Sequence, residues 1–208
     1  MKRLVPIVIL VALVIGTTLS CGLQPAADAA PTLDIVENPS FEETHMGWAS
    51  GWHKRALYEA EADVSYLLSS ESHSGNHSVR ITNINPNNTS VYQFIDVRPN
   101  TLYKISCWVK AMVVTGDLAA NITVLDSGAH SPEARNTRGG WVRLELYGMT
   151  GEYQTQMPLA LRLGGWLADT RGDAWFDDVS VEIVRNRPHA ANIKSLTFHD
   201  EKIGRAHV

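Results

Sequence analysis

Residues 103–110, Tyr103-Lys104-Ile105-Ser106-Cys107-Trp108-Val109-Lys110, decide the fold class. Apolar and polar side chains alternate along this stretch, which is the period of a β-strand with one buried face. The apolar set that we expect inside comprises Tyr103, Ile105, Cys107 and Val109. The set that we expect outside comprises Lys104, Ser106, Trp108 and Lys110.

The same period of two continues through most of residues 33–184, with turns marked by Gly, Asn, Asp and Pro. No long amphipathic helix is predicted. Nine short strands within one segment are typical of an all-β domain folded as a two-sheet sandwich. The predicted strands are 33–37, 62–68, 78–83, 91–97, 101–113, 118–125, 141–147, 159–164 and 174–183.

The composition of the 208 residues is that of a globular protein, with 44% hydrophobic and 19% charged residues. The net charge is −4, and acidic and basic residues are interspersed. Phosphate backbones require a basic stripe, and the sequence has none, so we expect no nucleic-acid partner. The chain has two cysteines, and we assign Cys107 to the core rather than to a disulfide or a nucleophile.

The first residues predict export. Met1–Arg3 is basic and the apolar run Leu4–Gly16 is short, as in a secretory signal peptide, so residues 1–30 are assigned to a signal peptide and spacer. Cleavage at Ala27–Ala29 would release a secreted protein. Lipid attachment at Cys21 would instead anchor it at a bacterial cell surface. We place secretion ahead of the anchored alternative.

The predicted β-sandwich domain covers residues 31–184. Residues 185–208 are polar and aperiodic at their start, so we assign them to a linker or to the beginning of a further domain. The last six residues, 203–208, resemble the translation of a sequencing adapter. We therefore expect an artificial C-terminus.

Two motifs near opposite ends of the domain each pair an aromatic residue with carboxylates. They are Asn38–Glu42 and Phe176–Val179. This pairing indicates that the two ends meet, with Glu42, Asp177 and Asp178 around a hard cation such as calcium. The alternative is that Glu42 hydrogen-bonds a turn and that the aspartates cap the last strand.

The motifs, in their order along the chain, resemble those of carbohydrate-binding modules of families 4, 9 and 22. The resemblance covers roughly residues 33–184. It rests on residues 38–42, Trp48, Trp52, residues 73–80, 92–97 and 103–110, Gly140-Trp141 and residues 176–181.

The resemblance implies a jelly-roll sandwich of the galactose-binding-domain type, a structural calcium near the chain ends and a groove for a polysaccharide or oligosaccharide. A sugar-binding site needs flat aromatic platforms beside hydrogen-bonding side chains. Alternation places Gln93 inside, whereas the resemblance implies that Gln93 contacts the ligand. Two alternatives stay open: a β-bulge turns Gln93 outward, or Gln93 is a buried amide whose hydrogen bonds are satisfied. The candidate carbohydrate-binding residues are Trp108, Trp48, Trp52, Arg80, Gln93, Tyr92 and Trp166.

We therefore expect a monomeric, non-catalytic carbohydrate-binding module that directs an attached enzyme or surface protein to a polysaccharide. The sequence contains no zinc-hydrolase motif, nucleophile elbow or phosphate loop. Two alternatives stay open. One is a surface β-sandwich that binds protein or acts as a spacer, and the other is a small jelly-roll polysaccharide lyase or glycoside hydrolase with an acid/base pair built across strands.

Overall fold

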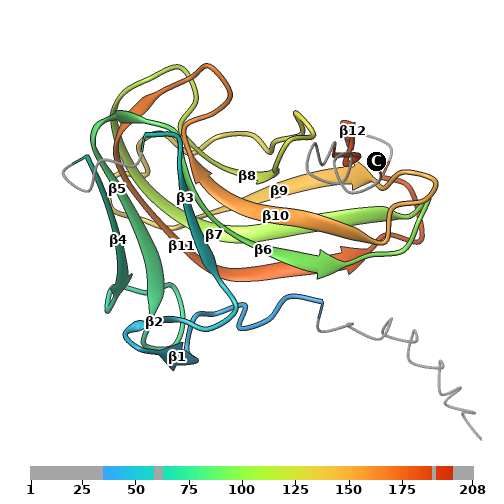
Figure 1. Ribbon diagram of the computed structural model, residues 1–208, viewed down its shortest axis with the longest axis horizontal. Coiled ribbons are helices and arrows are strands. Elements are labelled where there is room, and N and C mark those ends of the chain that lie inside the picture. Colours follow the sequence, from blue (N-terminus) through green and yellow to red (C-terminus); the bar gives the residue numbers. More distant parts are fainter. Residues whose placement is uncertain (1–34, 59–62, 189–190, 199–208) are drawn as a thin grey trace, which may run out of the picture. The chain divides into compact units, whose positions relative to one another are not determined.

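The computed structural model describes residues 35–58, 63–188 and 191–198 (Figure 1). The predicted signal peptide, the spacer up to residue 30 and the adapter-like residues 203–208 lie outside these ranges. Within them every regular element is a β-strand, and no helix is long and apolar enough to cross a membrane.

The strands are short at the start of the domain and long in its centre. Their bounds are β1 Thr44–His45, β2 Trp48–Ala49, β3 His53–Ala56, β4 Val64–Ser69, β5 Ser78–Asn87, β6 Thr89–Asp96, β7 Leu102–Thr115, β8 Ala120–Val124, β9 Val142–Met149, β10 Gln156–Leu163, β11 Thr170–Ile183 and β12 Ile193–Ser195.

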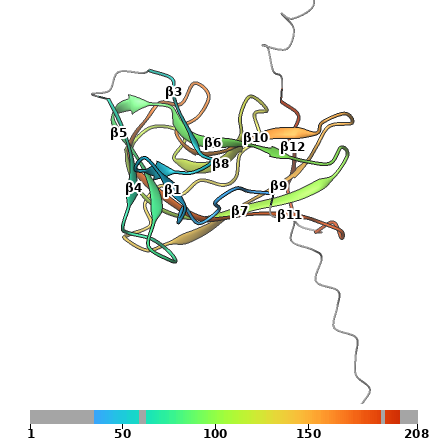
Figure 2. The same cartoon turned by 60° about the horizontal axis from the view of Figure 1, so that its bottom comes forward.

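These strands form a β-sandwich, as the sequence predicts. A four-stranded sheet has the order β3-β6-β10-β8, and a six-stranded sheet has the order β12-β9-β7-β11-β5-β4. The two sheets stack face to face in Figures 1 and 2, and the β1-β2 hairpin lies at one edge. β5 and β6 are joined by a tight turn yet belong to different sheets, so the chain passes between the layers there.

The core lies between the two sheets, and strand alternation fills it. In β7 the predicted inner residues Tyr103, Ile105, Cys107 and Val109 are all buried, which confirms the alternation predicted for this strand. Burial raises the pKa of the Cys107 thiol well above its usual range, so Cys107 is a core residue rather than a nucleophile. The four-stranded sheet contributes Val91, Ile95, Met157, Leu159 and Leu161 to the same core.

The six-stranded sheet extends beyond the predicted domain end. β12 pairs in parallel with β9, and Leu196, directly after it, is fully buried. Leu196 fits against Gly148, where a Cβ atom would lie 2.2 Å from Leu196 Cδ2. Residues 193–195 thus form an edge strand of this sheet, in the segment that the sequence assigned to a linker or to the beginning of a further domain.

The predicted first strand, residues 33–37, does not form in the described part of that range. Residues 35–37 have no ladder partner, and the segment instead lies beside the open end of β6. The Gln93 side chain takes the place of a neighbouring strand. Its Oε1 accepts a hydrogen bond from Glu37 N (2.9 Å) and its Nε2 donates one to Glu37 O (3.0 Å). A side-chain amide here makes the two bonds that a strand neighbour would make.

Candidate functional site

The two terminal motifs meet, as predicted. Val179 N donates a hydrogen bond to Pro39 O at 2.9 Å, which ties the first motif to β11. Asn38 shapes the turn, because its side chain bonds to Glu43 N, Glu43 O and Ser50 O. The left-handed backbone of Asn38 (φ 49°) and Phe41 (φ 61°) turns the Phe41 ring into the core.

The carboxylates of these motifs hold the loop of residues 71–77. Glu42 Oε1 accepts hydrogen bonds from the backbone N–H groups of Asn76 and His77, both at 2.8 Å. These bonds lower the pKa of Glu42 below its ordinary value. From the other side, Asp177 Oδ2 accepts from His73 N (2.7 Å) and Ser74 N (3.1 Å).

Calcium at this position stays a prediction. Burial raises the pKa of Asp177, while its backbone hydrogen bonds oppose that rise. The carboxylate oxygens of Glu42 and Asp177 already accept N–H donors, and Asp178 accepts from Ser74 Oγ at 2.7 Å and contacts His73 Nδ1 at 2.6 Å. Across the described residues there is no group of three or more Asp, Glu, His or Cys side chains that could hold a metal ion. Here the carboxylates act through hydrogen bonds to one loop.

Two predicted sugar contacts lie on the outer face of the six-stranded sheet, where other side chains occupy them. The His73 ring stacks on Trp108 with centroids 4.0 Å apart and planes at 12°, so one face of the indole is covered. Arg80 is bound to Asp173 (Nη2 to Oδ1, 2.6 Å) and lies over Trp175. Neither side chain shares a face with Tyr92, which belongs to the other sheet.

The predicted platform role of Trp52 is wrong. Its side chain is only 3% exposed, it packs on Phe41 with centroids 5.2 Å apart, and its Nε1 donates to Asn38 O. Trp48 is half-buried at the edge of the sandwich. Its ring is covered by Lys54 Nζ at 4.1 Å from the centroid, and its Nε1 donates to Trp52 O. Both tryptophans stabilise the first loop.

Gln93 is the satisfied buried amide that the sequence left open, with 4% of its surface exposed. Its hydrogen bonds to Glu37 use both ends of the amide, so it positions the chain and does not face solvent. Trp166 lies in the loop after β10 and is 78% exposed, beside Leu167, which is 89% exposed. The predicted loop position of Trp166 is confirmed, and its contact with a ligand remains a prediction.

The outer face of the four-stranded sheet carries a row of outward-pointing aromatic and polar side chains, which we call the platform face. Tyr92 and Phe94 point outward from β6, opposite the inward Val91, Gln93 and Ile95, and Phe94 is 54% exposed. Their rings meet edge to face with centroids 6.1 Å apart. His53 of β3 lies opposite Tyr92, with ring centroids at 5.5 Å.

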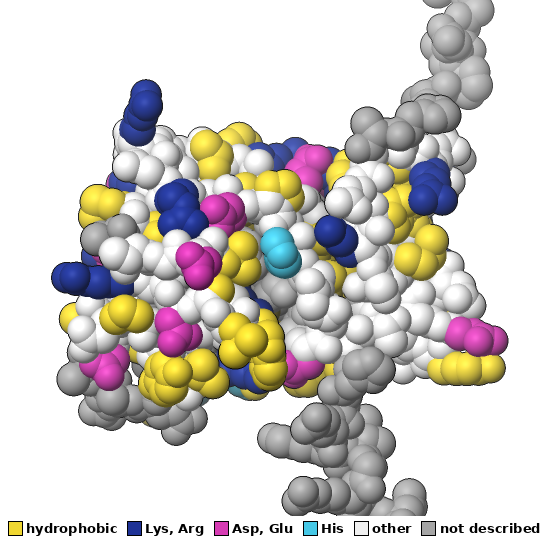
Figure 3. All heavy atoms as spheres, turned by 90° about the horizontal axis from the view of Figure 1, so that it is seen from above, with side chains coloured by type: hydrophobic (Ala, Val, Ile, Leu, Met, Phe, Trp, Pro, Cys, Tyr) yellow, Lys and Arg dark blue, Asp and Glu magenta, His cyan; other side chains and the backbone are white. Residues whose placement is uncertain are grey.

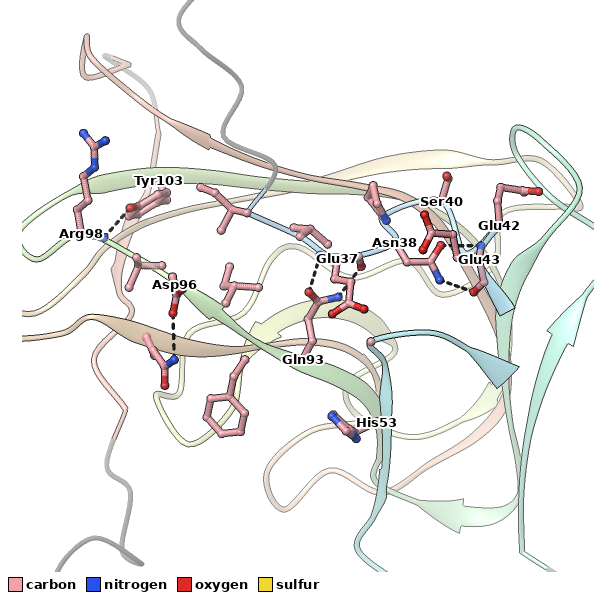
Figure 4. Close-up of a pocket in the computed structure, with 18 residues that line it drawn as sticks. Glu37, Asn38, Ser40, Glu42, Glu43, His53, Gln93, Asp96, Arg98 and Tyr103 are labelled. Atoms are coloured by element: carbon pink, nitrogen blue, oxygen red, sulfur yellow. Dashed lines mark hydrogen bonds between the residues drawn. The ribbon is translucent and has the colours of Figure 1, made fainter. Parts of the chain in front are cut away.

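Polar side chains continue the platform face beyond Phe94. Asp96 lies opposite Gln156 of β10, whose Nε2 donates to Asp96 Oδ1 at 3.0 Å. A hollow of about 1060 Å³ opens beside this end, between β6 and the segment around Glu37. Figure 4 shows Glu37, His53, Gln93 and Asp96 around this hollow. The arrangement offers flat apolar surface edged by hydrogen-bonding groups.

The sequence singled out only Tyr92 on this face. Alternation also places Phe94 and Asp96 outward and could have identified them, because Tyr92, Phe94 and Asp96 share one side of β6. His53 gave no signal, since β3 is a four-residue polar strand with no hydrophobic period. Charges are mixed over the molecular face seen in Figure 3, where acidic and basic side chains alternate without a one-sign patch.

Comparison with solved structures supports the fold. The structure of TmCBM61 in complex with β-1,4-galactotriose matches with a TM-score of 0.52 and 15% identity, over 72% of this chain and 98% of that one. A structure described as family 4 carbohydrate-binding module, "CBM4 structure and function", matches with a TM-score of 0.50 and 16% identity, over 71% and 99%.

A third match is tailspike protein 4 of bacteriophage CBA120, with a TM-score of 0.52 and 13% identity. It covers 72% of this chain but 21% of the tailspike chain, so the likeness concerns one part of that protein. At these identities the three matches establish the jelly-roll β-sandwich fold. Among curated proteins none matches the sequence.

The sequence itself matches a family model. The model described as "Carbohydrate binding domain", which represents carbohydrate-binding modules of types 4 and 9, aligns with residues 33–144, more than half of the chain. The aligned region includes the turn at Asn38–Glu42, the outward residues of β6 and the whole of β7. The chain belongs to this family of carbohydrate-binding modules, which are non-catalytic.

Proposed function

We propose that the protein binds a polysaccharide on the platform face. The observation that carries this proposal is the outward-facing pair of the half-buried Tyr92 and the exposed Phe94, flanked by His53 on one side and by Asp96 and Gln156 on the other. Apolar faces of sugar rings stack on aromatic rings, while their hydroxyl groups need both donors and acceptors at the edge. The platform face supplies both kinds of contact in one sheet.

A face with two stacking rings supports modest affinity. Dissociation constants between micromolar and millimolar correspond to about 4 to 8 kcal/mol, which fits a shallow surface that orders few side chains. A linear stretch of several sugars suits this geometry, because the outward residues follow one strand from Tyr92 to Asp96. The oligosaccharide held by the similarly folded TmCBM61 supports this ligand class.

Affinity electrophoresis of the purified protein tests the proposal. The protein is run through native gels that contain neutral and acidic plant, algal and microbial polysaccharides, and we expect retardation by at least one of them. The double variant Tyr92→Ala/Phe94→Ala should migrate freely in the same gel. Failure of every polysaccharide to retard the wild-type protein would overturn the proposed function.

The targeting role is a further part of this proposal. We propose that the module is exported, free or lipid-anchored at Cys21, and holds an attached enzyme near its polysaccharide by raising the local concentration. The charged and apolar leader of residues 1–16 and the family membership support this. Fusion of the module to a polysaccharide hydrolase should raise the rate on the insoluble form of a bound glycan while leaving the rate on soluble fragments unchanged.

Structural calcium near Glu42 and Asp177 also remains a proposal, supported by the resemblance of the two terminal motifs. A metal that binds only the folded state would stabilise it by mass action. Calcium should then raise the melting temperature of chelator-treated protein. A melting temperature that is the same with chelator and with excess calcium would count against the metal.

A further inference from the structure

Two arginines lie in one row across the platform face. Arg55 of β3 is opposite Ser90 of β6, and Ser90 is opposite Arg162 of β10. Neighbouring strands are about 4.8 Å apart, so the two arginine Cα atoms lie roughly 10 Å apart. The small Ser90 side chain between them is 3% exposed. The row therefore places two guanidinium groups on either side of a small, covered side chain.

Among the described residues, the charge of Arg162 has no carboxylate partner. Its Nε donates to the neutral Asn88 Oδ1 at 2.6 Å, and within the described ranges no carboxylate lies within 4 Å of its guanidinium. Burial, reinforced by the nearby charge of Arg55, lowers the pKa of Arg162 to about 10, against the opposite effect of Asp126. Arg162 thus remains protonated at neutral pH and is partly desolvated.

Asp126 neutralises only one of the two arginines. Its Oδ2 lies 3.4 Å from Arg55 Nη1, and both side chains are close to half exposed. An exposed pair at this distance is weak and screened by salt. Arg55, Arg162 and Asp126 together carry one excess positive charge, because two cations face one anion.

The guanidinium of Arg162 is held in a fixed position. Asn88, which binds it, is fixed in turn, since Asn88 N donates to Asn87 Oδ1 (2.7 Å) and Asn88 O accepts from Leu57 N (2.9 Å). With Nε engaged by Asn88, the terminal amino groups of Arg162 make no hydrogen bond within the described ranges and remain for another acceptor. A positioned guanidinium favours planar acidic groups, which it binds through two parallel hydrogen bonds.

We infer that the Arg55–Arg162 row binds the acidic group of a sugar, so that the preferred polysaccharide carries uronic acid residues among neutral ones. This inference rests on the proposed function, because the row continues the platform face. Ser90 and Tyr92 are two residues apart on β6, about 7 Å along the strand. A sugar stacked on Tyr92 therefore has a neighbour, or a side branch, within reach of the arginines.

Carboxylates at the other end of the platform face limit how many acidic sugars a preferred ligand can carry. Asp96 lies six residues from Ser90 on β6, about 20 Å away, and the exposed Glu37 borders the same hollow. These carboxylates repel acidic sugars. Four carboxylates line this hollow, those of Glu37, Glu42, Glu43 and Asp96, against the one arginine Arg98. The face is thus cationic at one end and carries a net negative charge at the other, which favours a sparsely carboxylated chain over a continuous polyuronate.

Matched pairs of polysaccharides test this inference. Glucuronoxylan and a glucuronate-bearing arabinogalactan are each compared with their own carboxyl-reduced product, and unsubstituted galactan, xylan and mixed-linked glucan serve as neutral ligands. We expect at least one acidic polymer to bind roughly tenfold tighter than its reduced product, because each lost charge-assisted hydrogen bond costs about that factor. Raising the salt concentration should narrow the difference.

Two variants locate the preference. Arg162→Gln should abolish most of the tenfold difference, and Arg55→Gln, at a more exposed position, should reduce it without endangering the fold. Arg143→Gln is the matched control: it removes the same charge from the outer face of the six-stranded sheet, where Arg143 is 43% exposed, and should leave the preference intact. Melting temperatures confirm that each variant is folded.

The outcomes separate this inference from the proposed function. Equal affinity for the acidic and reduced polymers, or retention of unsubstituted glycans alone, would overturn the acidic subsite. Neither result would contradict polysaccharide binding on the platform face. An acidic preference that survives Arg162→Gln and Arg55→Gln together would also overturn it. Loss of retention on every polymer would overturn both.

Discussion

Replacing Phe94 by alanine should weaken glycan binding about tenfold. Phe94 is 54% exposed, and since a Phe side chain offers about 200 Å² in total, about 110 Å² of it is open to a ligand. A sugar ring covers one face, roughly half of this area. At about 25 cal/mol per Å² the lost contact is worth about 1.4 kcal/mol, which is one factor of ten in the dissociation constant.

Isothermal titration calorimetry with a soluble polysaccharide that retards the wild-type protein measures this change. Tyr153→Ala provides the control, because Tyr153 is 85% exposed and lies in the loop between β9 and β10, outside the platform face. Both variants remove exposed aromatic surface, so both should retain the wild-type melting temperature. An unchanged dissociation constant in Phe94→Ala would refute the stacking argument, as would an equal loss in Tyr153→Ala.

Three further predictions concern stability. Trp108→Ala should lower the free energy of unfolding by about 1 kcal/mol through the lost stack with His73, and should leave glycan affinity unchanged; a loss of affinity would return Trp108 to the binding site. Leu196→Ala should cost about 2 kcal/mol or more in urea unfolding, because Leu196 is fully buried against Gly148. The lowered pKa of Glu42 stabilises the fold above the unfolded value of 4.5, and this contribution is lost as the pH falls through the folded value. Glu42→Gln should therefore show a weaker decline of melting temperature between pH 5 and pH 2.5, and an identical decline would contradict a stabilising role of the hydrogen bonds from Asn76 N and His77 N to Glu42.

The sandwich followed from local patterns, because a period of two fixes which side of each strand is buried. The alternation of β7 correctly predicted its inner face and the outward direction of its other residues, although Ser106 is covered and only 1% exposed. The turn around Asn38 and the aspartates after Phe176 correctly indicated that these two motifs meet. The short strands could not be predicted in this way. β3, His53-Lys54-Arg55-Ala56, has no hydrophobic alternation, and β12 pairs with β9 beside the buried side chain of Leu196, a contact that exists only once β9 is in place.

The binding face was harder to predict, because alternation separates the inside from the outside of a strand but does not say which sheet an outer residue belongs to. Trp108 and Tyr92 both lie on outer faces, yet on opposite sides of the molecule. Nor does the sequence show what covers an outer residue, as His73 covers Trp108 across 35 positions of the chain. Arg162 could be assigned to the acidic-sugar subsite only from the strand register, which places it in one row with Ser90 and Arg55.

The central claim is that glycan binds the outer face of the four-stranded sheet, and backbone amide NMR during titration with a bound oligosaccharide tests it most directly. The account predicts that the shifted resonances cluster in β3, β6 and β10, around His53, Tyr92, Phe94 and Gln156. Shifts that cluster instead around Lys104, Trp108 and Arg143, on the outer face of the six-stranded sheet, would contradict it.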